Sequence, residues 1–113
     1  MGEGLALIAE QEVGVYLPMI ASMRADIEAE ADVATAVNRL DKVLQENERT
    51  GQHWFDAELH RQRGELLLRF APADVTAAEA AFVQAIEVAR SQQTKMFELR
   101  ARVSLAKCRR AAG

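Results

Sequence analysis

The sequence has few of the residues that interrupt or cross-link a chain. Among 113 residues there are one cysteine, two prolines and six glycines, and only 5% are aromatic. Cys108 alone excludes an internal disulfide and fits a reducing compartment. Few turn residues and an apolar share of 50% predict helices joined by short loops around a core of Ala, Leu, Val and Ile.

Long hydrophobic runs are also lacking. The apolar run Val13–Ala21 is too short to cross a bilayer and contains Gly14 and Pro18. The first residues are acidic, whereas an export signal begins with basic ones. We therefore expect a soluble, cytoplasmic protein with no membrane contact, folded as a single domain over residues 1–113.

Charge is distributed unevenly along the chain. Residues 1–50 carry four basic and ten acidic residues, a net charge of −6, while residues 51–113 carry ten basic and seven acidic residues, a net charge of +3. Cations near the carboxyl end of a helix interact favourably with its dipole. The same cluster could bind an acidic partner or nucleic acid. Phe97 is the one ring nearby, so nucleic acid is the less favoured partner.

Apolar spacing predicts the helices of the first half. We expect the end of a helix at Leu5–Glu10, then a helix from Pro18 to about Ala29. The next helix covers about 33–48, with Asp32 as its N-cap and Gly51 as a left-handed C-cap. The expected inward residues are Ile20, Met23 and Ile27 in the first of these two helices, and Val33, Ala36, Val37, Leu40, Val43 and Leu44 in the second.

Three further helices are predicted in the second half. One begins near His53 and stops before Pro72, with Phe55, Leu59, Leu66 and Phe70 on its apolar stripe. A capping box at Thr76–Glu79 begins the next. Thr94 caps the last helix, which reaches about Ala111. The inward residues expected in these last two helices are Ala78, Phe82, Ala85, Ile86 and Ala89, and then Met96, Leu99, Val103 and Ala106.

A small residue opposite a small-large-small set indicates a closely packed helical hairpin. Gly64 in one helix and Ala78, Phe82 and Ala85 in the next form such a set. A second set, Ala36-x3-Leu40-x2-Val43, lies 42 residues earlier, and Glu58-Leu59 with Gly64 matches Glu98-Leu99 with Ser104 at an offset of 40. Together these patterns predict an all-α fold of antiparallel helical hairpins, a tetratricopeptide-like right-handed α-solenoid of five or six helices.

The chain resembles a known group of repeat segments. The runs Trp54–Leu68, Ala77–Phe82, Glu98–Ala101 and Ser104–Ala106 look like the tetratricopeptide-like carboxyl-terminal segments of large bacterial signalling proteins. Those proteins join a regulatory ATPase core to a class III nucleotide cyclase domain or a DNA-binding activator domain. The resemblance covers most of the chain from about Tyr16. It implies a helical sensor or scaffold part without the catalytic and DNA-binding parts.

The repeat pattern also places a candidate partner groove. Where such repeats usually carry a large aromatic residue and a leucine, this chain has His60 and Arg63, so we expect Leu59 and Leu66 to take over their packing. The groove positions form a mixed-charge surface without the Lys and Asn set that clamps a peptide carboxylate. They are Ser22, Asp26, Glu58, Arg61, Glu65, Arg69, Glu98 and Arg109.

The sequence contains few residues that could bind a metal ion or take part in catalysis. His53 and His60 lie two turns apart with Asp56 between them, but this spacing matches no established metal-ligand pattern. Charge pairs such as Glu58 and Arg61 are the common decoration of an exposed helix. Cys108 is expected to be an inert, half-buried thiol. We therefore expect no enzyme activity, metal or cofactor. The prediction is a non-catalytic protein- or peptide-binding scaffold, and the alternative is a small nucleic-acid-associated regulator using the basic last helix.

The last helix has apolar residues on two sides, and one of them has no obvious neighbour. If Met96, Leu99, Val103 and Ala106 face inward, the other side would face water. That side carries Phe97, Ala101, Leu105 and Cys108. An apolar patch of this kind usually marks an interaction surface. We expect these four residues to form a homodimer contact, and the Leu5–Ile8 segment is the competing cover.

Overall fold

The computed structural model describes residues 18–72 and 75–112, and every regular element in this part of the chain is an α-helix. The first helix covers residues 18–29. It is followed by α2 (Val33–Thr50), α3 (Asp56–Phe70), α4 (Thr76–Ser91) and α5 (Lys95–Ala112). The predicted all-α class is confirmed. The helix end expected at Leu5–Glu10 lies outside the described residues.

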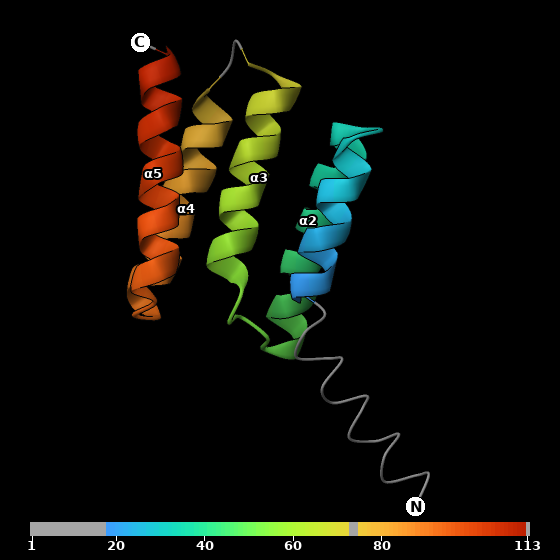
Figure 1. The fold of residues 1–113 in the computed structure, drawn as a ribbon. Coiled ribbons are helices and arrows are strands. Elements are labelled where there is room, and N and C mark those ends of the chain that lie inside the picture. Colours follow the sequence, from blue (N-terminus) through green and yellow to red (C-terminus); the bar gives the residue numbers. More distant parts are fainter. Residues whose placement is uncertain (1–17, 73–74, 113) are drawn as a thin grey trace, which may run out of the picture.

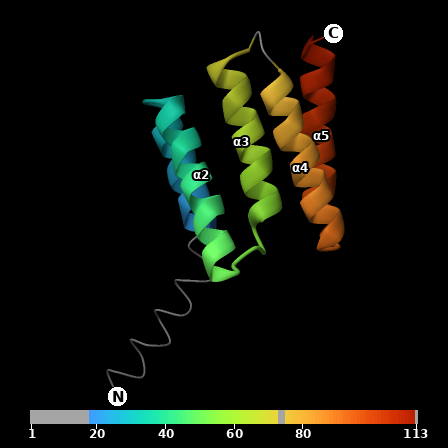
Figure 2. The same cartoon turned by 180° about the vertical axis from the view of Figure 1, so that it is seen from behind.

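The helices form two layers, with successive helices running in opposite directions. In Figure 1 the first helix, α3 and α5 lie side by side in the front layer, with α2 and α4 behind them. The view from behind in Figure 2 shows α2 and α4 in front. The central helix α3 contacts α2, α4 and α5. Helices close in sequence are therefore also close in space, as short connections require.

Both predicted ends of α2 are present. The carboxylate of Asp32 accepts a hydrogen bond from the N–H of Ala34 at 3.1 Å, which satisfies one of the donors left free at a helix start. Gly51 follows the last turn with φ +77°, and its N–H donates to the carbonyl of Asn47. Glycine suits this left-handed position because it has no Cβ to clash with the carbonyl that follows.

Two other predicted helix starts are wrong in detail. The helix α3 begins at Asp56, three residues after the predicted start. The residue that precedes α4 is Val75, whose carbonyl accepts the N–H of Glu79, so Thr76 is already helical and cannot act as the cap of a capping box. Thr94 does precede α5, but its hydroxyl donates to the carbonyl of Ala89.

The contact between α3 and α4 depends on Gly64. A Cβ placed on Gly64 would lie 2.5 Å from Cε1 of Phe82, closer than two carbon atoms can approach. Phe82 is fully buried, with Ala78 and Ala85 beside it in the same cluster. The predicted small-large-small set is therefore confirmed. Glycine at position 64 lets the aromatic ring pack directly against the α3 backbone.

The core consists of two clusters that α3 separates. One contains residues of α4 and α5, with Leu67 and Leu68 of α3 packed against it, and the other joins the first helix, α2 and α3. The second cluster includes both Leu59 and Leu66, as expected. Phe70, predicted to extend their stripe, is exposed. It lies in the last turn of α3.

The two outer helices face the opposite way from the prediction. Ile20, Met23 and Ile27 are exposed in the first helix, as are Met96, Leu99, Val103 and Ala106 in α5. Mainly smaller residues point inward instead, because short side chains allow helices to approach closely. These are Ala25 and Ala29 in the first helix, and Ala101, Ser104 and Cys108 in α5, where the larger Leu105 is also buried.

This rotation corrects the predicted dimer contact. Ala101, Leu105 and Cys108 are buried within the chain against α4, and Phe97 makes an edge-on ring contact with Phe55 at 5.8 Å between ring centres. Residues that are already covered in this way cannot form the surface of a dimer. The exposed apolar side of α5 is the one that carries Leu99.

The structure also corrects the repeat offset. An offset of 40 pairs buried Leu59 with Leu99, which is 63% exposed. An offset of 42 instead pairs three buried residues of α3 with buried residues of α5: Leu59 with Ala101, Gln62 with Ser104, and Leu66 with Cys108. It also agrees with the offset between Ala36 and Ala78, which are both buried. Gly64 then corresponds to Ala106, so Ser104 is a core residue but not the counterpart of Gly64.

Candidate partner groove

Six of the eight predicted groove residues line one cavity. It has a volume of about 310 Å³ and lies along the layer formed by the first helix, α3 and α5. The predicted residues in it are Ser22, Asp26, Glu58, Arg61, Glu65 and Arg69. Phe55, Gln62, Leu66 and Arg100 complete its lining. The repeat spacing thus selected six residues that the structure brings together around one cavity.

The groove exists because α3 presents polar residues at helical spacing between two neighbours. Glu58, Arg61, Glu65 and Arg69 recur every three or four residues and therefore lie on one face. This face points between the first helix and α5. Short side chains such as Ser22 on the first helix leave space beside α3, so the polar groups line a concave surface.

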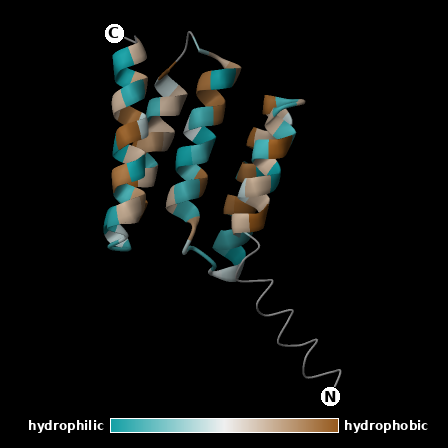
Figure 3. Ribbon diagram, in the orientation of Figure 1, coloured by the Kyte–Doolittle hydropathy of each residue, from teal (hydrophilic) through white to brown (hydrophobic). Residues whose placement is uncertain are grey.

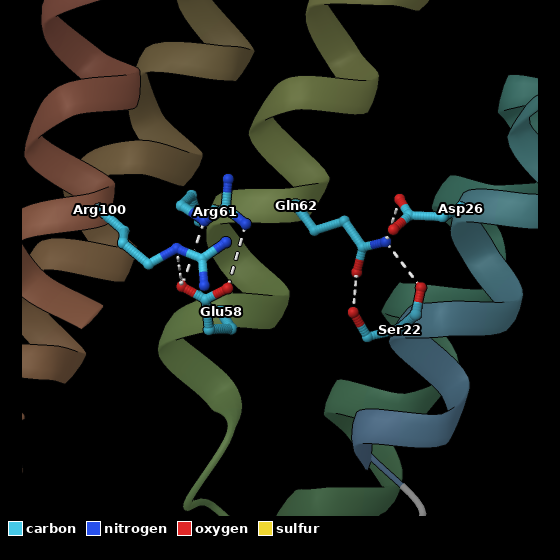
Figure 4. A network of polar contacts seen from close by, with 6 residues as sticks. All are labelled: Ser22, Asp26, Glu58, Arg61, Gln62 and Arg100. Carbon is cyan, nitrogen blue, oxygen red and sulfur yellow. Dashed lines mark hydrogen bonds and ion pairs between the residues drawn. The ribbon is translucent and has the colours of Figure 1, made fainter. Parts of the chain in front are cut away.

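Gln62 connects α3 to the first helix at one end of the groove. Its Nε2 donates to the carbonyl of Ser22 and to Oδ1 of Asp26, both at 2.7 Å, and its Oε1 accepts from the Ser22 hydroxyl at 2.6 Å. Figure 4 shows these three bonds spanning the two helices. Because Gln62 is buried, its carboxamide needs partners, and these bonds fix the position of the first helix against α3.

Glu58 holds two arginines at the other end. Glu58 is only 5% exposed, and its carboxylate accepts hydrogen bonds from Arg61 at 3.0 and 3.2 Å. Nε of Arg100 lies 3.5 Å from the same carboxylate and joins α5 to α3 (Figure 4). A buried carboxylate needs such partners to offset its lost hydration. Two guanidinium groups on one carboxylate leave this end with a surplus positive charge.

The two remaining predicted residues lie elsewhere. Glu98 accepts a hydrogen bond from Arg102, one turn later in α5, at 2.8 Å. Arg109 pairs with Glu79 of α4 at 3.2 Å. Both follow from the predicted repeat offset of 40, which pairs them with Glu58 and Arg69 and which the burial pattern does not support. Glu98 and Arg109 are therefore corrected to ion pairs outside the cavity.

Gln62 and Arg100 are the polar groove residues that the prediction missed. Gln62 lies four residues after Glu58 and three before Glu65, so its spacing already indicated the same face. Arg100 corresponds to Glu58 at the offset of 42, whereas the predicted offset of 40 between α3 and α5 selected Glu98 instead.

A second polar cluster lies where α2 meets α3. Asn47 Nδ2 donates to Oδ1 of Asp56 at 2.7 Å, and the other Asp56 oxygen lies 2.7 Å from Nδ1 of His53. This hydrogen bond raises the pKa of His53, whereas burial lowers the pKa of His60. Gln92 at the end of α4 donates to the His53 carbonyl at 2.9 Å. These hydrogen bonds connect the start of α3 to α2 and to the end of α4.

Side chains that commonly bind metal ions do not gather into a site in the described residues. No three His, Cys, Asp or Glu side chains in residues 18–72 and 75–112 are arranged to hold a metal ion. Cys108 is buried on the side of α5 that packs against α4, and desolvation raises the pKa of its thiol above the ordinary value. The groove itself offers hydrogen-bond donors, carboxylates and guanidinium groups, which suit binding to a polar chain.

The hydropathy of the described helices and the likeness to known proteins do not indicate a particular partner. In the part of the chain that the structure describes, no helix is both long and apolar enough to cross a membrane. Comparison with protein-family models, curated proteins and solved structures finds no match. The resemblance to tetratricopeptide-like signalling segments therefore stays a prediction.

Proposed function

We propose that this chain is a non-catalytic interaction module that binds a protein or peptide partner in the groove. The observation that carries the proposal is the cavity between the first helix, α3 and α5. Its polar side chains come from three helices and are held in place by bonds between them. Preorganised side chains lose less conformational entropy on binding, which is what a recognition surface requires.

We further propose that the helices form a tetratricopeptide-like right-handed α-solenoid within one domain over residues 1–113. Three features support this arrangement: two layers of alternating helices, contact between α3 and α5 in one layer, and burial that repeats after 42 residues. By its resemblance to bacterial signalling proteins, the chain would act as a cytoplasmic scaffold or sensor of a regulatory ATPase, cyclase or activator. The complete reading frame around the coding sequence tests that assignment.

The charges of the groove define the kind of partner that fits. Arg61 and Arg100 share Glu58, so an acidic side chain of the partner can approach their outer edges. Asp26 and Glu65 lie in the same lining and favour a basic or hydrogen-bond-donating group. A polar peptide segment carrying both signs of charge would therefore match this surface better than a strongly apolar one.

Selection from a random peptide library displayed on phage tests the proposal. The immobilised chain should enrich peptides whose binding is lost in Arg100→Glu. A matched control is Arg90→Glu, because Arg90 is an exposed cation on α4, in the other layer. Binding unaffected by Arg100→Glu, or lost equally in Arg90→Glu, would contradict a groove function. Circular dichroism confirms that both variants keep their helices.

The alternative, binding of nucleic acid by the basic α5, has less support. Three cations of this helix already pair with carboxylates: Arg100 with Glu58, Arg102 with Glu98, and Arg109 with Glu79. Nucleic-acid binding should weaken steeply as salt is raised, because cations that neutralise phosphates release counterions. Titration of labelled DNA and RNA at two salt concentrations separates this function from peptide recognition.

A further inference from the structure

The exposed hydrophobic residues concentrate at the two ends of the helix stack. Eight large hydrophobic side chains are exposed in the described residues, and six of them lie on the two outer helices. We name Ile20, Met23 and Ile27 the N-terminal stripe, and Met96, Leu99 and Val103 the C-terminal stripe. Each stripe has the spacing i, i+3, i+7, which places its side chains on one face of its helix.

Comparison with α3 identifies the C-terminal stripe as an uncovered packing face. At the offset of 42, Leu99 corresponds to Ala57 and Ala106 to Gly64. Both α3 residues are buried, and Gly64 packs directly against Phe82 of α4. The equivalent face of α5 has no such helix over it in the described residues. Figure 3 shows hydrophobic turns along α5 and along the helices at the other end of the stack.

Charge makes the two ends complementary to each other. The helix α5 contains six basic residues and one acidic residue, a net charge of +5. Residues 18–50, which form the opposite end of the stack, contain four basic and seven acidic residues, a net charge of −3. Opposite net charges accelerate association and favour this orientation. Two α5 helices facing each other would instead bring together two surfaces of net positive charge, although Arg100 and Arg109 are paired with Glu58 and Glu79.

The N-terminal end also provides space for a protruding side chain. A cavity of about 430 Å³ lies between the first helix and α2, and Ile20 belongs to its lining together with Pro18, Ala21 and Val43. Arg39 and Arg49, which also line it, are paired with Glu28 and Glu46. This surface can therefore receive an apolar side chain from a docking helix.

We propose that the occupant of the C-terminal stripe is the N-terminal stripe of a second copy of this chain. The two surfaces differ, so the contact is head-to-tail and leaves one free stripe at each end of a pair. Such a contact adds further copies until a ring closes, or forms an open filament. This self-association uses the ends of the stack and is independent of the groove.

Mixing two blocked variants tests this arrangement. Ile27→Lys blocks the N-terminal stripe and Leu99→Lys blocks the C-terminal stripe, each by placing a charge in an apolar contact. Both positions are well exposed in the single chain, so the helices should remain intact. In light scattering, the mass of the wild type should rise with concentration beyond a dimer. Each variant should stay monomeric, and an equimolar mixture should stop at a dimer.

A control variant and the outcomes that would overturn the proposal complete this test. Phe70→Lys changes a side chain that is as exposed as Leu99 but lies outside both stripes, and it should associate like the wild type. A wild type that stays monomeric at every concentration would overturn the proposal, and would favour cover of a stripe by another part of the chain or by a different protein. Association that survives either single variant, or a monomeric mixture, would also overturn it.

Discussion

The two sides of α3 are held by different physical means. Towards α4 the contact is close and apolar, with the Phe82 ring against the backbone of Gly64. Towards the first helix and α2, the apolar cluster is flanked by directed polar bonds from Gln62, Arg63 and Asp56. The stability of the contact with α4 should therefore depend on side-chain volume. The stability of the contact with the first helix and α2 should depend more on charge and hydrogen bonding.

Because of this difference, the two faces of α3 fit different neighbours: one face fits α4, and the other fits the first helix and α2. Apolar packing is stabilising but non-directional, so a close glycine contact is needed to define the position of α4. Polar bonds contribute less net free energy, but they fix orientation because each buried donor needs its acceptor. The ranking of mutational effects should follow this division.

Loss of the Phe82 ring should produce the largest effect on the apolar side. Phe82→Ala removes a fully buried aromatic side chain and leaves a cavity between α3 and α4, which should cost about 3–5 kcal/mol of unfolding free energy. Urea denaturation followed by circular dichroism measures this loss. Phe70→Ala, at an exposed ring, is the matched control, and an equal loss there would contradict the ranking.

Adding a single methyl group should disturb the same contact. In Gly64→Ala the new Cβ would overlap the Phe82 ring, and overpacking of this kind costs about 1–3 kcal/mol. The better helix propensity of alanine offsets up to about 1 kcal/mol of that cost. Thermal melting should show a lower Tm, partly restored by adding Phe82→Leu. A higher Tm for Gly64→Ala alone would mean that the close contact is absent.

On the polar side, Asp56 should matter most. Asp56→Ala leaves the buried Asn47 amide without its acceptor, which should cost about 1–3 kcal/mol. Asp56→Asn retains an acceptor for Asn47 and should lose less. Urea denaturation of both variants provides the comparison. If the two variants are equally destabilised, the hydrogen bond from Asn47 does not account for the loss.

The ion pair between Arg63 and Asp41 should contribute little. Its atoms lie 2.6 Å apart, but both side chains are partly exposed, so solvent screens their attraction. A double-mutant cycle with Arg63→Gln and Asp41→Asn should give a coupling free energy of about 0.2–1 kcal/mol. The coupling should fall as salt is added. A larger value that persists in salt would place this pair among the main supports of the α2–α3 contact.

The smallest expected effect is the pH dependence from His53. The hydrogen bond with Asp56 raises the pKa of His53, and the charge of Glu48 adds to the shift. The resulting stability is present below the ordinary pKa of histidine and is lost as pH rises through the raised value. The difference in Tm between wild type and His53→Gln should therefore shrink between about pH 5 and 8. A difference that grows with pH would contradict this assignment.

His60 also contributes to the pH dependence, so the experiment uses the difference in Tm between the wild type and His53→Gln. Burial lowers its pKa, so its contribution acts in the opposite sense and is lost as pH falls below the ordinary histidine value. Because both wild type and His53→Gln retain His60, its effect cancels in their difference.

Sequence patterns predicted the interior helices well. Asp32 and Gly51 at the ends of α2, the Gly64–Phe82 contact and the buried face of α4 were all anticipated. In these places one face is clearly more apolar, or one residue type is required by the backbone. Six groove residues followed from the same register, because α3 supplies most of them and its rotation was correct.

The outer helices could not be oriented from sequence. Each has apolar residues on two faces, and periodicity alone does not say which face meets the core. The structure buries the smaller residues, such as Ala25 and Ala101, and exposes the larger ones, such as Ile27 and Leu99. Close approach to neighbouring helices decides this choice, and it depends on tertiary contacts. The misplaced Glu98 and Arg109 follow instead from the predicted repeat offset of 40 between α3 and α5.

The order in which the helices stack has a mechanical consequence. The helix α5 contacts α3 and α4, while the central α3 has neighbours on both sides. A chain pulled by its two ends would therefore lose its outer helices before its centre, since each outer helix is secured from one direction only. The first helix, which contributes only the small side chains of Ala25 and Ala29 to its apolar cluster beside the hydrogen bonds of Gln62, should detach at lower force than α5, which also contributes Leu105 and Cys108.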